Sequence, residues 1–210
     1  MRYERKYRLE SVGLSAIEQV IRAHPAGFRT LYPDRQINNI YFDTPNLQAF
    51  ADNVAGVADR KKYRVRWYGQ VEEYVEQPKL ELKAKRNQLG FKKTTSIQPF
   101  SAKELPQMVA EVNQLIPDLP SLRPTLVNAY QRSYFATADQ KFRITIDTDL
   151  AFGYCNEQFL HLPFRDFETT IIELKYDAPF ELELDRITQY LPFRLTKSSK
   201  YVYGVNRLYY

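Results

Sequence analysis

The sequence predicts an α+β protein built on an antiparallel β-sheet. Segments with alternating polar and apolar residues outnumber helical segments, and they follow one another instead of alternating one-for-one with helices. Charged residues recur on one face of these segments, as expected for strands with one polar and one apolar face. At 210 residues and 44% hydrophobic content, the chain is expected to form one domain over residues 1–210.

Eight segments have the alternation and the Tyr, Phe, Thr, Ile and Val content typical of strands. They cover residues 2–9, 36–43, 59–69, 79–86, 90–98, 124–137, 141–153 and 168–177. Helical spacing predicts helices over residues 15–24, 46–53, 101–115 and 181–190. Ser15 is the predicted N-cap of the first helix, and Ser101 with Glu104 predicts a capping box at the third.

The stretch "KKYRVRWYG" (61–69) shows the polar face most clearly. Because successive strand side chains point to opposite faces, Lys62, Arg64 and Arg66 share one face and the apolar residues share the other. Such a face is commonly exposed to water. Eight antiparallel strands form either a sandwich or a closed barrel, and closure would turn the cations toward one another. Two like charges 4 Å apart repel by roughly 4 kcal/mol at an effective dielectric of about 20, so a polyanion would stabilise such a lining.

Composition excludes several classes of protein. The net charge of +5 suggests an anionic partner without identifying one. One cysteine, Cys155, and two histidines do not make an internal disulfide or a usual zinc site, so a metal would be held by carboxylates, which favours Mg²⁺ or Mn²⁺. No glycine-rich phosphate loop and no apolar run of membrane-spanning length occurs, and we expect a cytoplasmic protein.

A series of short motifs resembles the polyphosphate polymerase domain of the vacuolar transporter chaperone (VTC) family. The motifs are "RYERKYRL", "NNIYFDTPNLQAF", "KKYRVRWYG", "LELKAKR", "NAYQRSYF", "FRITIDTDL", "IIELKYD" and "TKSSKYVYGVNRL", and they span the whole chain. That family belongs to the triphosphate tunnel metalloenzymes, the CYTH-like superfamily. The resemblance implies a closed eight-stranded antiparallel β-barrel with helices packed outside. It also implies a metal-dependent enzyme that transfers the γ-phosphoryl group of ATP to a growing polyphosphate chain.

The resemblance also implies roles for individual residues. The expected catalytic phosphate ligands are Lys6, Arg64, Arg66, Lys83, Arg132 and Lys200. The expected substrate-binding residues are Lys85, Tyr130, Lys197 and Ser199, and Glu173 is the expected ligand of Mn²⁺ or Mg²⁺. Glu4 and Glu81 either bind metal or orient a lysine. Arg2 stands where the wider superfamily has the first glutamate of an ExExK motif, which puts two-metal hydrolysis in doubt.

Two alternatives to a polymerase stay open. A hydrolase of the same fold would transfer the phosphoryl group of a triphosphate or polyphosphate to water. A non-catalytic protein would bind polyphosphate or, less well, nucleic acid, because carboxylates on the strand faces would repel a nucleic-acid backbone. We expect ATP or another triphosphate and polyphosphate as ligands, no nucleic acid, and no membrane segment, although a separate membrane partner is compatible with the sequence.

Overall fold

The computed structural model describes residues 2–69, 74–86, 89–117, 121–155 and 162–210, without the side chains of residues 85, 86 and 89. All eight predicted strands are present. They are β1 (Arg2–Glu10), β2 (Arg29–Asp43), β3 (Arg60–Tyr68), β5 (Lys79–Arg86), β6 (Leu89–Ser96), β8 (Arg123–Ala136), β9 (Phe142–Gly153) and β11 (Thr169–Asp177). Short strands β4 (Tyr74–Val75), β7 (Phe100–Ser101) and β10 (Phe164–Asp166) accompany them.

The strand order in the large sheet is β10-β9-β11-β1-β6-β5-β3-β2-β8, and β8 also pairs with β9. The eight long strands therefore form a closed cycle of pairings. The registers of β1 with β11, β11 with β9, β2 with β3, β3 with β5, and β5 with β6 are antiparallel. Residues directly opposite each other in these registers have side chains on the same face.

The chain divides into two compact units, each assembled from separate segments. Unit 1 comprises residues 1–35, 130–150 and 166–198, and unit 2 comprises residues 36–129, 151–165 and 199–210. Strands β2, β8 and β9 each contribute residues to both units. The prediction of one domain over residues 1–210 stays a prediction.

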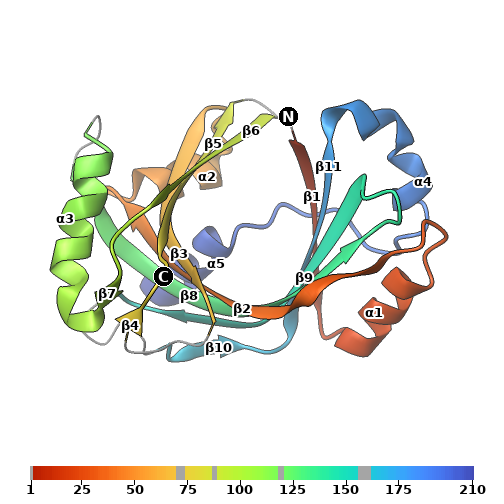
Figure 1. The fold of residues 1–210 in the computed structure, drawn as a ribbon, viewed down its shortest axis with the longest axis horizontal. Coiled ribbons are helices and arrows are strands. Elements are labelled where there is room, and N and C mark those ends of the chain that lie inside the picture. Colours follow the sequence, from red (N-terminus) through yellow and green to blue (C-terminus); the bar gives the residue numbers. More distant parts are fainter. Residues whose placement is uncertain (1, 70–73, 87–88, 118–120, 156–161) are drawn as a thin grey trace. The chain divides into compact units, whose positions relative to one another are not determined.

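In unit 1, the apolar faces of β1, β9 and β11 are covered by α1 (Leu14–Arg22) and the turns around α4 (Asp185–Thr188) (Figure 1). Ile17 and Ile21 lie one helical turn apart on α1 and are fully buried. They belong to the same cluster as Ile144 of β9 and Ile172 of β11. The alternation seen in the sequence thus places aliphatic residues in this core and leaves the charged residues on the opposite face.

In unit 2, α3 (Leu105–Leu115) covers the apolar faces of β2, β3 and β5, and Figure 1 shows it in green beside the strands of this unit. Met108 and Val112 of α3 pack in one cluster with Ile40, Val65 and Leu80. A 3₁₀ turn, η1 (Ala102–Glu104), precedes α3. The predicted capping box is confirmed at this turn.

Two helix predictions need correction, and one helix was not predicted. The first helix begins at Leu14 after Gly13, so Ser15 is not its N-cap. Residues 181–190 form no continuous helix: a 3₁₀ helix, η2 (Ala178–Glu183), leads into the four-residue α4. The C-terminal α5 (Lys200–Tyr209) was not predicted, because three tyrosines and a glycine in ten residues hide its helical pattern. The remaining helix, α2 (Gln48–Ala55), agrees with prediction.

Candidate functional site

The polar face of unit 2 contains a cluster centred on Glu81 of β5. Arg64 of β3 donates from Nε and Nη2 to Glu81 Oε2 at 2.8 and 2.5 Å. Arg66 Nη1 lies 3.8 Å from the same oxygen, and Lys92 of β6 forms an ion pair with Glu81 Oε1. One buried carboxylate therefore faces three cations. We call these four residues the Glu81 cluster.

The neighbouring cations keep the Glu81 carboxylate ionised. Burial alone would raise the pKa of Glu81, but Arg64, Arg66 and Lys92 lower it to about 2. Glu81 therefore stays ionised at neutral pH although its side chain is only 3% exposed. Each of the three cations in turn has Glu81 as a counter-ion.

A row of lysines crosses the same face next to this cluster. Lys62 of β3 is directly opposite Lys83 of β5, and Lys83 is directly opposite Lys92 of β6. Like charges at directly opposite positions destabilise a sheet. Such a row is therefore expected where an anion lies over the strands.

Polar side chains of β2 hold the two arginines in place. Arg64 Nη1 donates to Tyr41 Oη at 3.3 Å, and Arg66 Nε donates to Asn39 Oδ1 at 2.8 Å. Asn39 in turn donates from Nδ2 to Asn128 Oδ1 of β8 at 2.7 Å. Because both arginines are more than nine-tenths buried and restrained at Nε or Nη, their guanidinium planes are fixed.

The N-terminus of α5 adds another hydroxyl and another cation to unit 2. Ser199 is the N-cap of α5, and its Oγ accepts hydrogen bonds from Val202 N at 3.3 Å and from Lys62 Nζ at 2.9 Å. Lys200 follows it and is buried, with 8% of its surface exposed. Positive charge at this helix end is unfavourable by itself, because the N-terminus of a helix attracts anions.

Close packing anchors α5 to unit 2. A Cβ atom at Gly204 would lie 2.5 Å from Phe152 and 2.7 Å from Leu126, so only glycine allows this approach. Tyr201 Oη donates to Asp43 Oδ2 at 2.5 Å, and its ring stacks on Tyr41. The position of Ser199 and Lys200 therefore depends on the packing of the helix that follows them.

The polar face of unit 1 has a second cluster, centred on Glu173 of β11. Arg132 of β8 donates to both carboxylate oxygens of Asp147 of β9, at 2.5 and 2.6 Å, and its Nη2 lies 3.5 Å from Glu173 Oε2. Lys175 Nζ donates to Glu173 Oε2 at 2.6 Å, and Lys6 Nζ of β1 lies 3.3 Å from Glu173 Oε1. With Glu4, which is also 3.3 Å from Lys6 Nζ, these residues form the Glu173 cluster.

The carboxylates of this cluster keep its cations charged. Burial would lower the pKa of Lys6, but Glu4 and Glu173 raise it above its usual value. Burial also opposes the charge of Arg132, yet Asp147, Tyr130 and Glu173 raise its pKa. The guanidinium of Arg132 lies over the ring of Tyr130, with Cζ 5.3 Å from the ring centroid.

The structure divides most of the predicted site residues between the two units. Unit 2 contains Arg64, Arg66, Lys83, Ser199 and Lys200, and unit 1 contains Lys6, Tyr130, Arg132 and Glu173. Lys197 is exposed and belongs to neither cluster. The side chain of Lys85 lies outside the described part of the structure. The catalytic and binding roles of these residues stay predictions.

Sequence reasoning assigned no role to several residues that the structure places in the clusters. Asp147 alternates with apolar residues in "FRITIDTDL", and Lys92 alternates with Phe91 in "LGFKKTTS", so the pattern contained a signal for both. The sequence did not indicate a role for Asn39 or Asn128, because asparagine is uncommon in strands and is usually taken to mark a turn or an edge. Glu81, for which the sequence left metal binding and orientation of a lysine open, contacts two arginines and a lysine.

The Glu173 cluster offers oxygen ligands to a metal. Among the residues that the structure describes, no three His, Cys, Asp or Glu side chains come together in a metal-binding arrangement. Mg²⁺, however, is commonly held by one or two carboxylates plus substrate phosphates. Glu4 and Glu173, which flank Lys6, supply such a pair, so the residues present fit a metal completed by phosphate oxygens. Binding it would require Lys6 to move.

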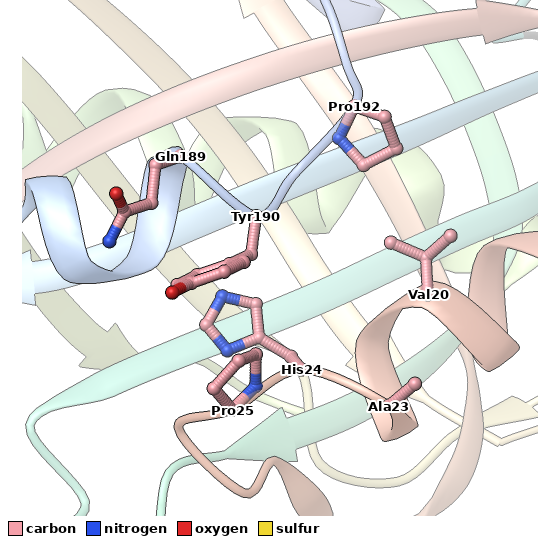
Figure 2. Close-up of a pocket in the computed structure, with 7 residues that line it drawn as sticks. All are labelled: Val20, Ala23, His24, Pro25, Gln189, Tyr190 and Pro192. Atoms are coloured by element: carbon pink, nitrogen blue, oxygen red, sulfur yellow. The ribbon is translucent and has the colours of Figure 1, made fainter.

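A pocket of about 400 Å³ lies elsewhere in unit 1, beside the end of α1 (Figure 2). Its lining includes His24, Tyr190 and Pro192 and has no lysine, arginine or carboxylate. His24 Nδ1 accepts from Ala26 N at 3.0 Å, and Nε2 is 2.9 Å from Ile187 O. Both ring nitrogens are thus bound to backbone groups, and this pocket does not suit phosphate.

The family model of the VTC domain matches residues 1–209. The chain belongs to the VTC-domain family. A solved structure of a Pyrococcus horikoshii OT3 protein is similar to this VTC domain, with 13% identity, a TM-score of 0.57, and coverage of 98% of this chain and 99% of that chain. The comparison with curated proteins found no match.

Two further similar structures are proposed adenylate cyclases. The one from Vibrio parahaemolyticus has 12% identity, a TM-score of 0.55 and coverage of 94% of both chains. The one from Bacillus halodurans has 14% identity, a TM-score of 0.53, and coverage of 100% of the VTC domain and 99% of that chain. These likenesses confirm the predicted fold class, the closed eight-stranded antiparallel β-barrel of the triphosphate tunnel (CYTH-like) type. Across the described part of the VTC domain, no helix has the length and apolar content needed to span a bilayer.

Proposed function

We propose that this VTC domain is a metal-dependent polyphosphate polymerase that transfers the γ-phosphoryl group of ATP to a growing polyphosphate chain. The observation that carries the proposal is the gathering of cations on the polar face of unit 2, where Arg64, Arg66 and Lys92 converge on Glu81 and Lys62 lies directly opposite Lys83. A substrate with several phosphate groups suits such a face. The Glu173 cluster contributes Lys6 and Arg132 as further phosphate ligands.

The proposed reaction needs no covalent nucleophile on the protein. A terminal oxygen of the polyphosphate chain attacks the γ-phosphorus of ATP, the bond from that phosphorus to the β,γ-bridging oxygen breaks, and ADP leaves. The arginines and lysines hold the phosphates in line and neutralise charge on the transferring group. A bound Mg²⁺ or Mn²⁺ would add charge neutralisation at Glu173.

The ion pairs favour phosphate over water as the acceptor. Glu4, Glu81, Asp147 and Glu173 each contact at least one lysine or arginine. A carboxylate in such a pair is a weak base, whereas water needs a base to become a good nucleophile. The terminal phosphate of a chain is already anionic. The similar proteins described as proposed adenylate cyclases suggest cyclisation of ATP as a further activity to test.

The deciding experiment is to incubate the purified protein with ATP and Mn²⁺ and to measure polyphosphate, orthophosphate and cyclic AMP. Accumulation of long-chain polyphosphate with little orthophosphate supports the polymerase. Release of orthophosphate without chain growth supports a hydrolase, and cyclic AMP with pyrophosphate supports a cyclase. Absence of all three products, together with binding of tripolyphosphate, leaves the non-catalytic binding protein.

The metal and phosphate roles are separable by mutation. Glu173→Gln should preserve tripolyphosphate binding but remove turnover with Mn²⁺, because a neutral amide is a poor ligand for a hard cation. Arg66→Ala should instead abolish most of the ligand-induced rise in melting temperature, since a ligand at about 100 times its Kd stabilises by roughly 2.7 kcal/mol. The exposed Arg123→Ala is the matched control. Full Mn²⁺-dependent turnover in Glu173→Gln would refute the metal assignment.

Oligonucleotides should compete poorly with polyphosphate. The sequence has no recognised nucleic-acid-binding module. Displacement of labelled polyphosphate by a single-stranded oligonucleotide at equal phosphate concentration would favour a nucleic-acid-binding function instead.

A further inference from the structure

A chain of hydrogen bonds in unit 2 ends at a buried donor for which the described residues provide no hydrogen-bond partner. The chain runs from Arg66 to Asn39 to Asn128. Asn128 is fully buried, and its Nδ2 makes no hydrogen bond in the structure. The three residues come from β3, β2 and β8, and all of them belong to unit 2.

The direction of this chain follows from the chemistry of arginine. A guanidinium only donates hydrogen bonds, so Asn39 must present Oδ1 to Arg66 Nε. Asn39 therefore has only Nδ2 left for its contact with Asn128, and Asn128 must accept through Oδ1. The remaining group of Asn128 is then an NH₂. Turning the amide over would place two donors against each other, so the orientation is not arbitrary.

An unsatisfied buried NH₂ is unfavourable in the free protein, and native proteins contain few of them. Glu81, the carboxylate of the cluster that includes Arg66, already accepts from Arg64 and forms ion pairs with Arg66 and Lys92. An oxygen brought by a ligand would satisfy the donor. Arg66, which begins the same hydrogen-bond chain, favours an anion as that ligand.

We propose that Asn128 is a further substrate-binding residue, whose Nδ2 donates a hydrogen bond to a non-bridging phosphate oxygen of the polyphosphate or triphosphate held by the Glu81 cluster. Arg66 and Asn39 orient this donor before the substrate arrives. Such pre-orientation lowers the cost of binding, because the amide itself need not be ordered when the ligand arrives. The groups that cover Nδ2 in the unliganded structure must move aside for this contact. The inference rests on the proposed function, since it names one more contact of the same substrate.

The test uses Asn128→Asp, which keeps the oxygen that Asn39 needs and replaces only the NH₂. The matched control is Asn38→Asp, the same change at a neighbouring buried asparagine whose Nδ2 donates to Gly69 O at 3.0 Å. Asn38 is next to Asn39 on β2, so its side chain points to the opposite face. Binding of tripolyphosphate is measured by calorimetry for both variants and the unaltered chain.

Asn128→Asp is expected to weaken tripolyphosphate binding by roughly 10- to 100-fold, the loss of a hydrogen bond to a charged acceptor. Asn38→Asp is expected to change binding less than about threefold, the effect of a site remote from the ligand. Asn128→Ala, which leaves room for a water molecule, should show a loss in the same direction and serves if the aspartate variant does not fold. The melting temperature of unliganded Asn128→Asp is measured alongside, because a carboxylate at this fully buried position carries a desolvation cost.

Three results would overturn the inference. If the unaltered chain and both Asn128 variants bind tripolyphosphate with equal affinity, the Asn128 amide contacts only water and not the ligand. Equal losses in Asn128→Asp and Asn38→Asp would show a general effect of buried charge. Failure of the unaltered chain to bind tripolyphosphate would overturn the proposed function as well, so the two failures are distinguishable.

Discussion

The Glu81 cluster of unit 2 and the Glu173 cluster of unit 1 use the same residue types in different proportions. Glu81 is one carboxylate among three cations. The Glu173 cluster has three carboxylates, Glu4, Asp147 and Glu173, with the cations Lys6, Arg132 and Lys175. Counted over these side chains of the described residues, the first cluster has more cations than carboxylates, whereas the second has equal numbers.

This difference in charge balance predicts different effects of mutation on stability. A cluster with more cations than carboxylates is stabilised by a bound polyanion. In a balanced cluster, removal of one member leaves another without its partner. Loss of an arginine should therefore cost more stability in unit 1 than in unit 2, in addition to any loss of phosphate binding at either cluster.

The largest expected effect is on stability, from Arg132→Leu in unit 1. Asp147 has no exposed side-chain surface and would lose both hydrogen bonds from the guanidinium. Removing one member of such a buried pair costs roughly 3–5 kcal/mol of unfolding free energy. Denaturant unfolding measures this loss. Arg2→Leu, in a pair whose side chains are 53% and 52% exposed, should leave the midpoint almost unchanged. Equal midpoints for the two variants would contradict the contrast between the clusters.

A smaller effect is expected from Glu81→Gln in unit 2, which should lower stability but increase the affinity for tripolyphosphate. The amide accepts fewer charged hydrogen bonds, so unfolding free energy should fall by roughly 1.5–3 kcal/mol. Tripolyphosphate should bind more tightly, because the carboxylate no longer competes for Arg64, Arg66 and Lys92. Titration calorimetry checks the affinity, with the exposed Glu76→Gln as control. Weaker binding in Glu81→Gln would mean that Glu81 positions the arginines more than it competes with the ligand.

The smallest effect is on the pH dependence of stability. The pKa of Glu81 is about 2 in the folded protein, whereas an unperturbed glutamate has a pKa of 4.5, so the unfolded chain binds the proton more readily. Its contribution is therefore fully present above about pH 4.5 and is lost as the pH falls toward about 2. The difference in unfolding free energy between the unaltered chain and Glu81→Gln should therefore decrease as the pH falls over this range. A difference that stays constant down to pH 2 would show that Glu81 is not held ionised by its partners.

Period-2 alternation was sufficient to locate all eight long strands and their polar faces. It succeeded because burial of one face constrains every second residue, as in Phe142, Ile144 and Ile146 of β9. The helical signal was less reliable near the C-terminus. There α5 is stabilised by the contact of Gly204 with Leu126 and Phe152 and by the bond from Tyr201 to Asp43, and both are long-range interactions.

The site could be predicted as a set of charged residues but not as a network. The motifs identified Arg64, Arg66, Arg132 and Glu173. They suggested Lys175 as a salt-bridge partner of Glu173 but gave no partner for the arginines, because register decides which side chains are opposite each other. The connection from Arg66 through Asn39 to Asn128 joins three strands and has no counterpart in local sequence.

The sequence by itself determined which residues share a strand face, since that depends only on alternation along the backbone. Its motif series also identified the family. Only the tertiary structure decided how charge is shared, with one carboxylate for three cations around Glu81 and a balanced set around Glu173. The physical reason is that electrostatic and hydrogen-bond energies depend on distances between strands, and those distances are set by pairing and packing over the whole chain.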